Sequence, residues 1–238
     1  MTGIGLAVSI ILAWIFSVFW ALTQIRIAGT SALLSHLSTI IWIQFLSCGL
    51  FITAHDACHG TAAPGRPRVN LWLGRIAAFL YAGFIFDSMA PKHAAHHRSP
   101  GQKEDPDFHS NVPGREEFHW WIARFFSHYL SVGQLLFMTG VSQVLMHGFH
   151  LPEVNVLGFW VLPSVLSAVQ LFYFGTYLPH RRHADLPFPD RHHTRNSAQS
   201  YLVSLWACFH FGAYHHRHHL EPSVPWFKLP KKRAPSRV

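Results

Sequence analysis

The sequence predicts an all-α integral membrane protein: a bundle of four transmembrane helices with a histidine-rich, metal-binding cap at one end. Half of its 238 residues are hydrophobic and only 13% are charged, which does not suit an ordinary soluble globule. Four apolar runs approach or exceed the length needed to cross the ~30 Å hydrocarbon core of a bilayer. The chain also has 20 histidines, clustered after these runs. We therefore treat residues 1–238 as one membrane domain.

The first two spans are expected at residues 4–25 and 32–54. The first run carries no charge, is longer than the apolar part of a usual signal peptide, and lacks a basic segment before it. The second run contains only His36 as an ionisable group. Because the turn between the runs is short, the two helices form an antiparallel hairpin. The second helix then delivers His55 and His59 to the face where the chain begins.

A third apolar segment, residues 71–89, is interrupted by glycine, arginine and aspartate. If it crossed the membrane, the histidines at 93–97 would lie on the opposite side from His55. A shared metal site requires them to lie on the same side. We therefore expect this segment to dip into the bilayer and return, or to lie in the interface.

Two further spans are expected at residues 130–147, which is marginal in length, and 156–178. The polar connection before them ends in FHWWIARFF, whose tryptophans and arginine suit the membrane–water boundary. The last span places His180 on the side of the earlier histidine clusters. Of the 19 Lys and Arg residues, 18 lie in residues 55–128 and 179–238. By the positive-inside rule, the histidine cap faces the cytoplasm.

The net charge of +8 does not indicate a nucleic-acid partner. Basic residues cluster beside the apolar runs, as expected of a protein that faces an anionic membrane leaflet. The three cysteines, Cys48, Cys58 and Cys208, form no C-x-x-C pair. Neither a disulfide framework nor a zinc ribbon is therefore indicated.

Three histidine clusters have spacings that suit metal binding. The clusters at 93–97 and 215–219 both contain H-x-x-H-H, and the cluster at 55–59 is H-x-x-x-H. On a helix, residues at i, i+3 and i+4 share one face, so their imidazoles can converge on an ion. The predicted metal ligands are His55, His59, His93, His96, His97, His215, His218 and His219, and His180 would make nine. Imidazoles suit zinc, iron, copper or nickel, and nine are too many for one ion but about right for two.

The other histidines are not among the predicted ligands. His216 should point away, because His215, His218 and His219 repeat the spacing of the second cluster and leave it out. His183 and His210 are undecided. Ordinary structural roles are expected for His109, His119, His128, His147, His150, His192 and His193.

Carboxylates should support the ligands, because a metal-bound imidazole usually donates its other N–H to a carboxylate or carbonyl. The candidates are Asp56, Glu104, Asp105, Asp107 and Asp190. We favour Asp56, since it lies between two predicted ligands.

Other chemistries find no support in the sequence. There is no glycine-rich phosphate loop, no H-E-x-x-H and no G-x-S-x-G. Haem needs two axial ligands from facing helices rather than triplets at the ends of spans. A histidine-rich metal transporter should place ionisable residues inside its spans, and a membrane anchoring protein has no need of three matched clusters.

The order of the spans and clusters resembles the integral-membrane di-iron superfamily of fatty acid desaturases and hydroxylases. A narrower resemblance, to the bacterial beta-carotene ketolase family, covers nearly the whole chain from about Phe51. It is carried by FITAHDACHG, PGRPRVN, KHAAHHRSPG followed by EDPDF, FGTYLPHR, PFPDRH, SLWACFHFG leading into HHRHH, and VPWFKLP. The clusters alone indicate the superfamily, and the stretches between them indicate the narrower family.

This resemblance implies insertion of a keto group at C4 of a beta-ionone ring. Beta-carotene would become echinenone and canthaxanthin, or zeaxanthin would become astaxanthin. It also implies O2, two iron ions and an external electron donor such as ferredoxin. The eight cluster histidines would be iron ligands, and His180 stands where the superfamily's extra ligand is found. A carotenoid hydroxylase or fatty acid desaturase of the same superfamily is the alternative.

Two positions depart from the family pattern: Arg217 stands where many relatives have an acidic residue, and Cys58 replaces a more usual methionine. The implied substrate is a hydrocarbon without hydrogen-bonding groups, so its site should be an apolar tunnel reached from the lipid. The sequence does not identify the residues that line it.

Overall fold

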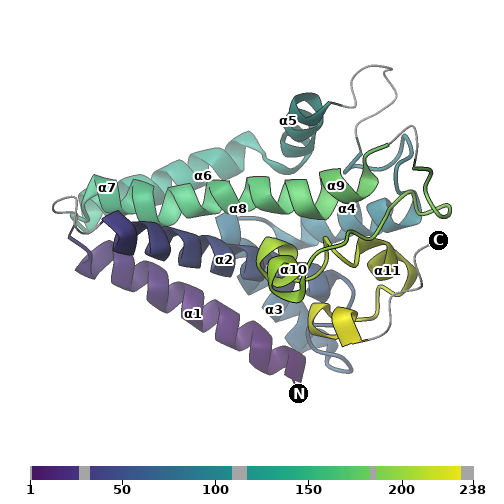
Figure 1. Ribbon diagram of the computed structural model, residues 1–238. Coiled ribbons are helices and arrows are strands. Elements are labelled where there is room, and N and C mark those ends of the chain that lie inside the picture. The colour runs from purple at the N-terminus through teal and green to yellow at the C-terminus, as the bar shows by residue number, and fades with distance from the viewer. Residues whose placement is uncertain (1, 27–32, 109–116, 183–185, 232–238) are drawn as a thin grey trace.

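The computed structural model describes residues 2–26, 33–108, 117–182 and 186–231. The regular elements in these ranges are helices, in agreement with the predicted all-α class (Figure 1). His109, His183 and the end of the basic tail, residues 232–238, lie outside the described residues.

Three long apolar helices form the body of the bundle. They are α1 (Thr2–Gln24), α2 (Leu33–Cys58) and a composite helix, Glu153–His180. The composite helix consists of α7 (Glu153–Val156), the π-helical η3 (Leu157–Val161), α8 (Leu162–Leu171), the π-helical η4 (Phe172–Tyr177) and α9 (Leu178–His180). Each is long and apolar enough to cross a membrane. They coincide with three of the four predicted spans and indicate a membrane protein.

The segment predicted at 71–89 is not one helix. Instead, α3 (Pro67–Ala82) and α4 (Phe86–Arg98) meet at a bend of 100°. Gly83 caps α3 in the left-handed region, with φ 67°, and donates its N–H to the last turn of α3. The chain therefore turns sharply, and α4 returns its histidines to the end of α2.

The close approach of these helices depends on Gly74 in α3. A Cβ atom there would lie 2.5 Å from the ring of Phe86 and 2.9 Å from Cβ of Ala57. Because both neighbours are packed, any larger side chain would push α3 away from α2 and α4.

A second bent pair occupies the region of the predicted span at 130–147. Here α5 (Phe118–Tyr129) meets α6 (Val132–Gln143), which continues into the π-helical η2 (Val144–Gly148), and the bend is 82°. Ser131 caps α6 by accepting a hydrogen bond from the backbone of Gln134 at 3.1 Å. The helix therefore begins two residues later than predicted. The described residues contain three helices of spanning length, or up to five spans if each bent pair counts as one.

The C-terminal elements begin with a helix that packs against the sides of α2 and α8, and they end with two short helices where α2, α4 and α9 finish (Figure 1). They are α10 (Tyr201–Cys208), α11 (His215–Leu220) and the 3-10 helix η5 (Trp226–Lys231). Phe209 and His210 have positive φ values of 46° and 70°, and they turn the chain between α10 and α11. This turn places the third histidine cluster against the first two.

Candidate metal centre

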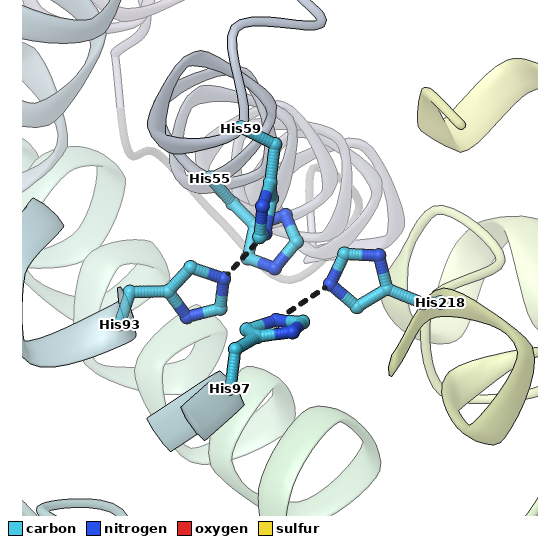
Figure 2. A group of neighbouring side chains, drawn as sticks. All are labelled: His55, His59, His93, His97 and His218. Carbon is cyan, nitrogen blue, oxygen red and sulfur yellow. Dashed lines mark hydrogen bonds between the residues drawn. The ribbon is translucent and has the colours of Figure 1, made fainter. Parts of the chain in front are cut away.

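Nine histidines gather at this end of the bundle, in two adjoining groups, from α2 and the turn after it, α4, α9 and α11. The first group is His55, His59, His93, His97 and His218 (Figure 2). The second group is His96, His180, His215 and His219. Within each group, one ligand nitrogen of each residue lies within 4.8 Å of those of all the others. The two groups contain all nine of the histidines predicted as ligands and no other histidine of the described chain.

In the first group, side chains from α2 and the turn after it, from α4 and from α11 point toward a common centre (Figure 2). The Nε2 atoms of His59 and His93 are 2.7 Å apart, and those of His97 and His218 are 3.1 Å apart. The ring of His55 lies 4.3 Å from that of His93. Two nitrogens bound to one ion at ~2.1 Å and at right angles are about 3 Å apart. The observed spacing fits an ion at the centre of this group.

In the second group, the Nε2 atom of His215 faces two others at once. It lies 2.8 Å from Nε2 of His180 and 3.1 Å from Nε2 of His219. A single ring proton can bridge only one of these two pairs. Three nitrogens directed at one point are therefore better explained by a bound ion than by hydrogen bonds among the rings.

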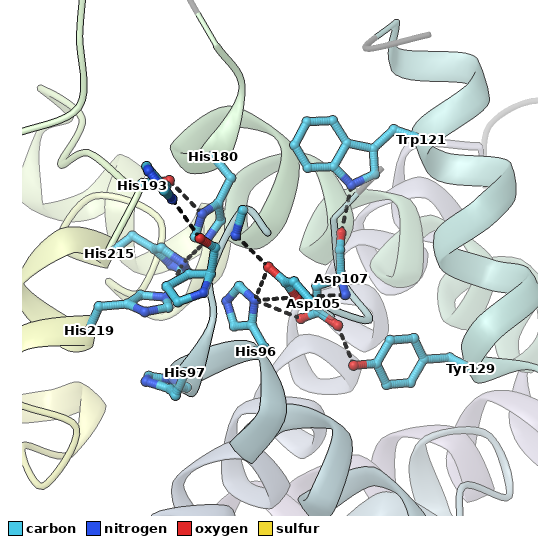
Figure 3. A network of polar contacts seen from close by, with 12 residues as sticks. His96, His97, Asp105, Asp107, Trp121, Tyr129, His180, His193, His215 and His219 are labelled. Carbon is cyan, nitrogen blue, oxygen red and sulfur yellow. Dashed lines mark hydrogen bonds and ion pairs between the residues drawn. The ribbon is translucent and has the colours of Figure 1, made fainter. Parts of the chain in front are cut away.

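A carboxylate orients the fourth member of this group (Figure 3). The Nδ1 atom of His96 lies 2.9 and 3.0 Å from the two carboxylate oxygens of Asp105, which leaves Nε2 for an ion. The backbone N–H groups of Gly101 and Asp107 also donate to Asp105, at 2.7 and 2.9 Å. Burial lowers the pKa of His96, but the charges of Asp105 and Asp107 outweigh it and raise the pKa to about 9. A carboxylate behind a ligating histidine is the usual support in metal sites.

A backbone carbonyl supports His180 in the same way. Its Nδ1 atom donates to the carbonyl oxygen of His193 at 2.8 Å, and Nδ1 of His193 donates to the carbonyl of Pro100 at 2.8 Å (Figure 3). His193 thus links the loop after α9 to the loop after α4. From the sequence, we expected only an ordinary structural role for His193. A contact made through its backbone carbonyl cannot be predicted from the spacing of side chains.

The preference for Asp56 as a supporting carboxylate is not matched by the structure. Its carboxylate accepts a hydrogen bond from the backbone of Trp226 at 3.4 Å, and in the described chain it makes no hydrogen bond or ion pair with any of the nine histidines. Successive residues of a helix point about 100° apart, so Asp56 cannot share the face of His55 and His59. Asp105 takes the position instead, from a loop.

The remaining candidates lie outside both groups. As predicted, His216 points away: its Nε2 atom is 2.9 Å from Asp190, which also contacts His192. His210 is buried and bonds the hydroxyl of Ser204 at 2.6 Å. Glu104 is exposed. His36, His119, His128, His147, His150, His192 and His193 also lie outside the two groups.

Most of the grouped histidines are held neutral. Burial, and then the neighbouring imidazoles, keep the pKa values of His93, His97, His215, His218 and His219 well below the ordinary value. The same causes lower the pKa of His59 to about 4. Neutral imidazole is the form that binds metal ions, so these side chains do not have to lose a proton at neutral pH.

An apolar cavity adjoins both histidine groups. Its wall includes His55 and His93 of the first group and His96 and His215 of the second. Aromatic side chains form much of the remaining wall: Phe51, Phe84, Phe125, Phe126, Phe172 and Phe211. Part of this wall comes from α5, for which the sequence indicated only a position at the membrane boundary. A flat apolar ligand in this cavity would lie next to both candidate metal sites.

Arg217, whose role the sequence does not explain, connects α11 to η5. Only 4% of it is exposed, and its Nη1 atom donates to the carbonyl of Leu229 in η5 at 3.0 Å. Its Nη2 atom lies 3.5 Å from Glu221. The side chain therefore points away from the histidine groups and fastens the C-terminal 3-10 helix to α11.

Replacing Arg217 by methionine is expected to lower the midpoint of thermal unfolding in detergent. The variant keeps the length of the side chain but leaves the buried carbonyl of Leu229 without its charged donor, a loss of about 2 kcal/mol. Arg68→Met removes the same charge from an exposed site and serves as the control. If both variants unfold at the same temperature, the hydrogen bond from Arg217 to Leu229 does not stabilise the fold.

The comparisons with known proteins agree with this geometry. The profile of the fatty acid desaturase family matches residues 30–155 and 132–237. A beta-carotene ketolase from a Paracoccus strain is 45% identical over 238 residues, which cover 98% of this chain and 94% of the relative. A beta-carotene ketolase from a second Paracoccus strain is 41% identical over 235 residues, covering 98% and 93%.

A more distant relative is the zeaxanthin 4-ketolase of Chlamydomonas reinhardtii, which is 35% identical over 254 residues. The alignment covers 99% of this chain and 54% of that protein. No solved structure matches the chain. The family profile spans most of the chain, and the two bacterial relatives align along almost all of it, so the chain belongs to the fatty acid desaturase family and, within it, to the beta-carotene ketolases.

Proposed function

We propose that this protein is a membrane-bound beta-carotene 4-ketolase. It introduces keto groups at C4 and C4′ of the beta-ionone rings, with O2 as co-substrate and electrons from an external carrier such as reduced ferredoxin. The observation that carries the proposal is the apolar cavity that touches both histidine groups, in a chain similar to beta-carotene ketolases along its whole length.

The nine grouped histidines are the proposed ligands of two iron ions, one in each group. Imidazole donors alone suit several metals, and the desaturase family favours iron. The donor set fits, because the rings are mostly neutral and their Nε2 atoms converge at 2.7–3.1 Å. When bound, the iron supplies the activation of O2 that oxidation of a C–H bond requires. Asp105 and the carbonyl of His193 hold two of the ligand rings in the required tautomer.

The cavity performs the other part of the reaction by placing the ring. A beta-ionone ring offers no hydrogen-bonding group, so its binding depends on apolar contact with the aromatic wall. Histidines of both groups line the same cavity, so a bound ring can present C4 to either candidate metal site. Phe172 and Phe211 of the wall are nearly inaccessible to solvent, which favours a dry environment for the reacting carbon.

In the membrane arrangement that we propose, four segments cross the bilayer: α1, α2, α6 with η2, and the composite helix Glu153–His180. The pair α3 and α4 enters and returns, and α5 lies at the interface. The bend of 100° between α3 and α4 supports this arrangement, because it returns His93 to His55 and His59. The distribution of Lys and Arg favours a cytoplasmic position for the metal sites.

Two alternatives remain within the same chemistry. A carotenoid hydroxylase or fatty acid desaturase would use the same histidine groups. Rings that already carry a hydroxyl at C3 are a second candidate substrate, and one relative is named a zeaxanthin 4-ketolase. Conversion of zeaxanthin to astaxanthin is therefore included in the proposal.

Expression in bacteria that accumulate beta-carotene tests the proposal. Chromatography of the pigments is expected to show echinenone and canthaxanthin. Unchanged beta-carotene in cells that contain folded, iron-loaded protein would contradict the ketolase assignment. Hydroxylated products without a ketone would instead identify a hydroxylase.

A further inference from the structure

The cavity beside the histidine groups contains few polar side chains other than histidines. They are Tyr81, Asp107, Tyr129 and Thr176. Three of them already have partners: the hydroxyl of Tyr129 donates to the carboxylate of Asp107, and the hydroxyl of Tyr81 accepts from Ser167 at 3.3 Å. A ligand oxygen could bond Tyr129 or Asp107 only in competition with their hydrogen bond, whereas the hydroxyl of Tyr81 accepts from Ser167 and keeps its own O–H to donate.

Thr176 differs from the other three. It is buried in η4, and its hydroxyl makes no hydrogen bond to any residue in the described part of the chain. A helical threonine usually bonds the carbonyl one turn earlier, as Thr53 does with Gly49 at 2.8 Å. The hydroxyl of Thr176 is therefore available to a ligand in the cavity.

The position of Thr176 places such a ligand near the candidate metal sites. It precedes His180 by four residues along the composite helix, so the two side chains lie on about the same face, one turn apart. His180 belongs to the second histidine group. An oxygen bonded to Thr176 would thus lie toward the histidine end of the cavity.

The proposed reaction creates an oxygen of this kind. In the first oxidation, a C4–H bond, O2, two electrons and two protons give C4–OH and water. In the second, the remaining C4–H bond is oxidised in the same way, and the resulting gem-diol loses water to give the ketone. Both rounds use the O2 and the one-electron carrier already named. Between them, the ring carries a polar group that has to be retained in an apolar cavity.

We propose that the hydroxyl of Thr176 hydrogen-bonds the C4 hydroxyl left by the first oxidation, so that the ring stays in place for the second. A threonine hydroxyl both donates and accepts, and so matches an alcohol. The inference rests on the proposed ketolase function and concerns only its second oxidation. It makes Thr176 a residue that decides whether the product is an alcohol or a ketone.

The test is the ratio of 4-hydroxylated to 4-keto carotenoids made from beta-carotene. Thr176→Val has nearly the same shape without the hydroxyl, and it is expected to raise this ratio about fivefold to tenfold, the factor expected for one hydrogen bond. Thr176→Ser should restore the ratio. The control is Thr53→Val, which removes a buried threonine hydroxyl bonded within its own helix. Released alcohol can bind again and be oxidised, so the ratio is compared with that of the Thr53→Val control at equal amounts of folded enzyme.

Several outcomes would overturn the inference. An unchanged ratio in Thr176→Val would do so, as would loss of alcohol and ketone alike in both Thr176→Val and Thr176→Ala with iron retained. A third is a slower reaction of Thr176→Val with zeaxanthin alone, which would assign the contact to a C3 hydroxyl. If the wild-type protein forms no product oxygenated at C4, the proposed function itself fails, which is a different result.

Discussion

Replacing His218 by alanine is expected to abolish ketone formation and to lower bound iron, whereas His216→Ala leaves both near the wild-type level. His218 is 1% exposed, and its Nε2 atom lies 3.1 Å from Nε2 of His97 in the first histidine group. Loss of a supporting residue behind a metal ligand already costs 10- to 100-fold, so loss of the ligand should cost at least about 100-fold. Elemental analysis of iron per chain and chromatography of the pigments measure the two effects.

His216→Ala is the matched control for His218→Ala. His216 lies on the same short helix, and its ring bonds Asp190 outside both groups. Its removal leaves the nine grouped histidines in place. Equal losses in the two variants would show that the third cluster binds metal in a different register.

The sequence predicted the long helices well, because an apolar run of spanning length is a local property. It did not predict where the helices bend. The segment at 71–89 has nearly the same hydropathy on both sides of Gly83, yet that residue ends α3 in a left-handed cap and α4 leaves at 100°. The span predicted at 130–147 had its start misplaced for a similar reason, since the break before Val132 is a cap and not a change in polarity.

Eight of the nine histidines were predicted from spacing, because i, i+3 and i+4 define one helix face, and His180 was predicted from its place after the last span. Their division between two groups was not predictable in this way. His96 and His97 are adjacent in α4 but belong to different groups, since successive helical side chains point about 100° apart. Only the positions of α9 and α11 determine which ring each of them meets.

Helix spacing also could not predict which carboxylate supports the ligands. Asp56 was favoured because it stands between two ligands in sequence, whereas Asp105 reaches His96 from nine residues away through the loop after α4. That loop is ordered around the carboxylate itself, which accepts hydrogen bonds from the backbone of Gly101 and of Asp107. The role of a loop carboxylate that is held by the backbone of its own loop cannot be predicted from helix periodicity.

Asp105→Asn is therefore expected to remove iron selectively from the second histidine group. His96 belongs to that group and not to the first, so iron should fall from two ions per chain toward one, and ketone formation should fall about 10- to 100-fold. The charge of the carboxylate favours Nδ1 of His96 as the donor and so directs Nε2 toward the ion. An amide at position 105 lacks the negative charge that raises the pKa of His96, so the effect of burial lowers that pKa. Without the charge, the tautomer of His96 is no longer fixed.

The substitution by asparagine removes the charge of Asp105 but is not expected to unfold the loop. Its amide oxygen still accepts the hydrogen bond from Gly101, while the backbone N–H of Asp107 loses its acceptor. The loop that holds Pro100 near His193 is therefore expected to persist, with only a small decrease in the midpoint of thermal unfolding of the iron-free protein. Asp56→Asn is the matched control, because its carboxylate accepts from Trp226 and, in the described chain, makes no hydrogen bond or ion pair with the nine histidines. Two ions per chain and full activity in Asp105→Asn, or an equal loss of iron in both variants, would contradict the assignment. A loss confined to Asp105→Asn would make the charge of this residue, rather than its place in the loop, the support on which the second ion depends.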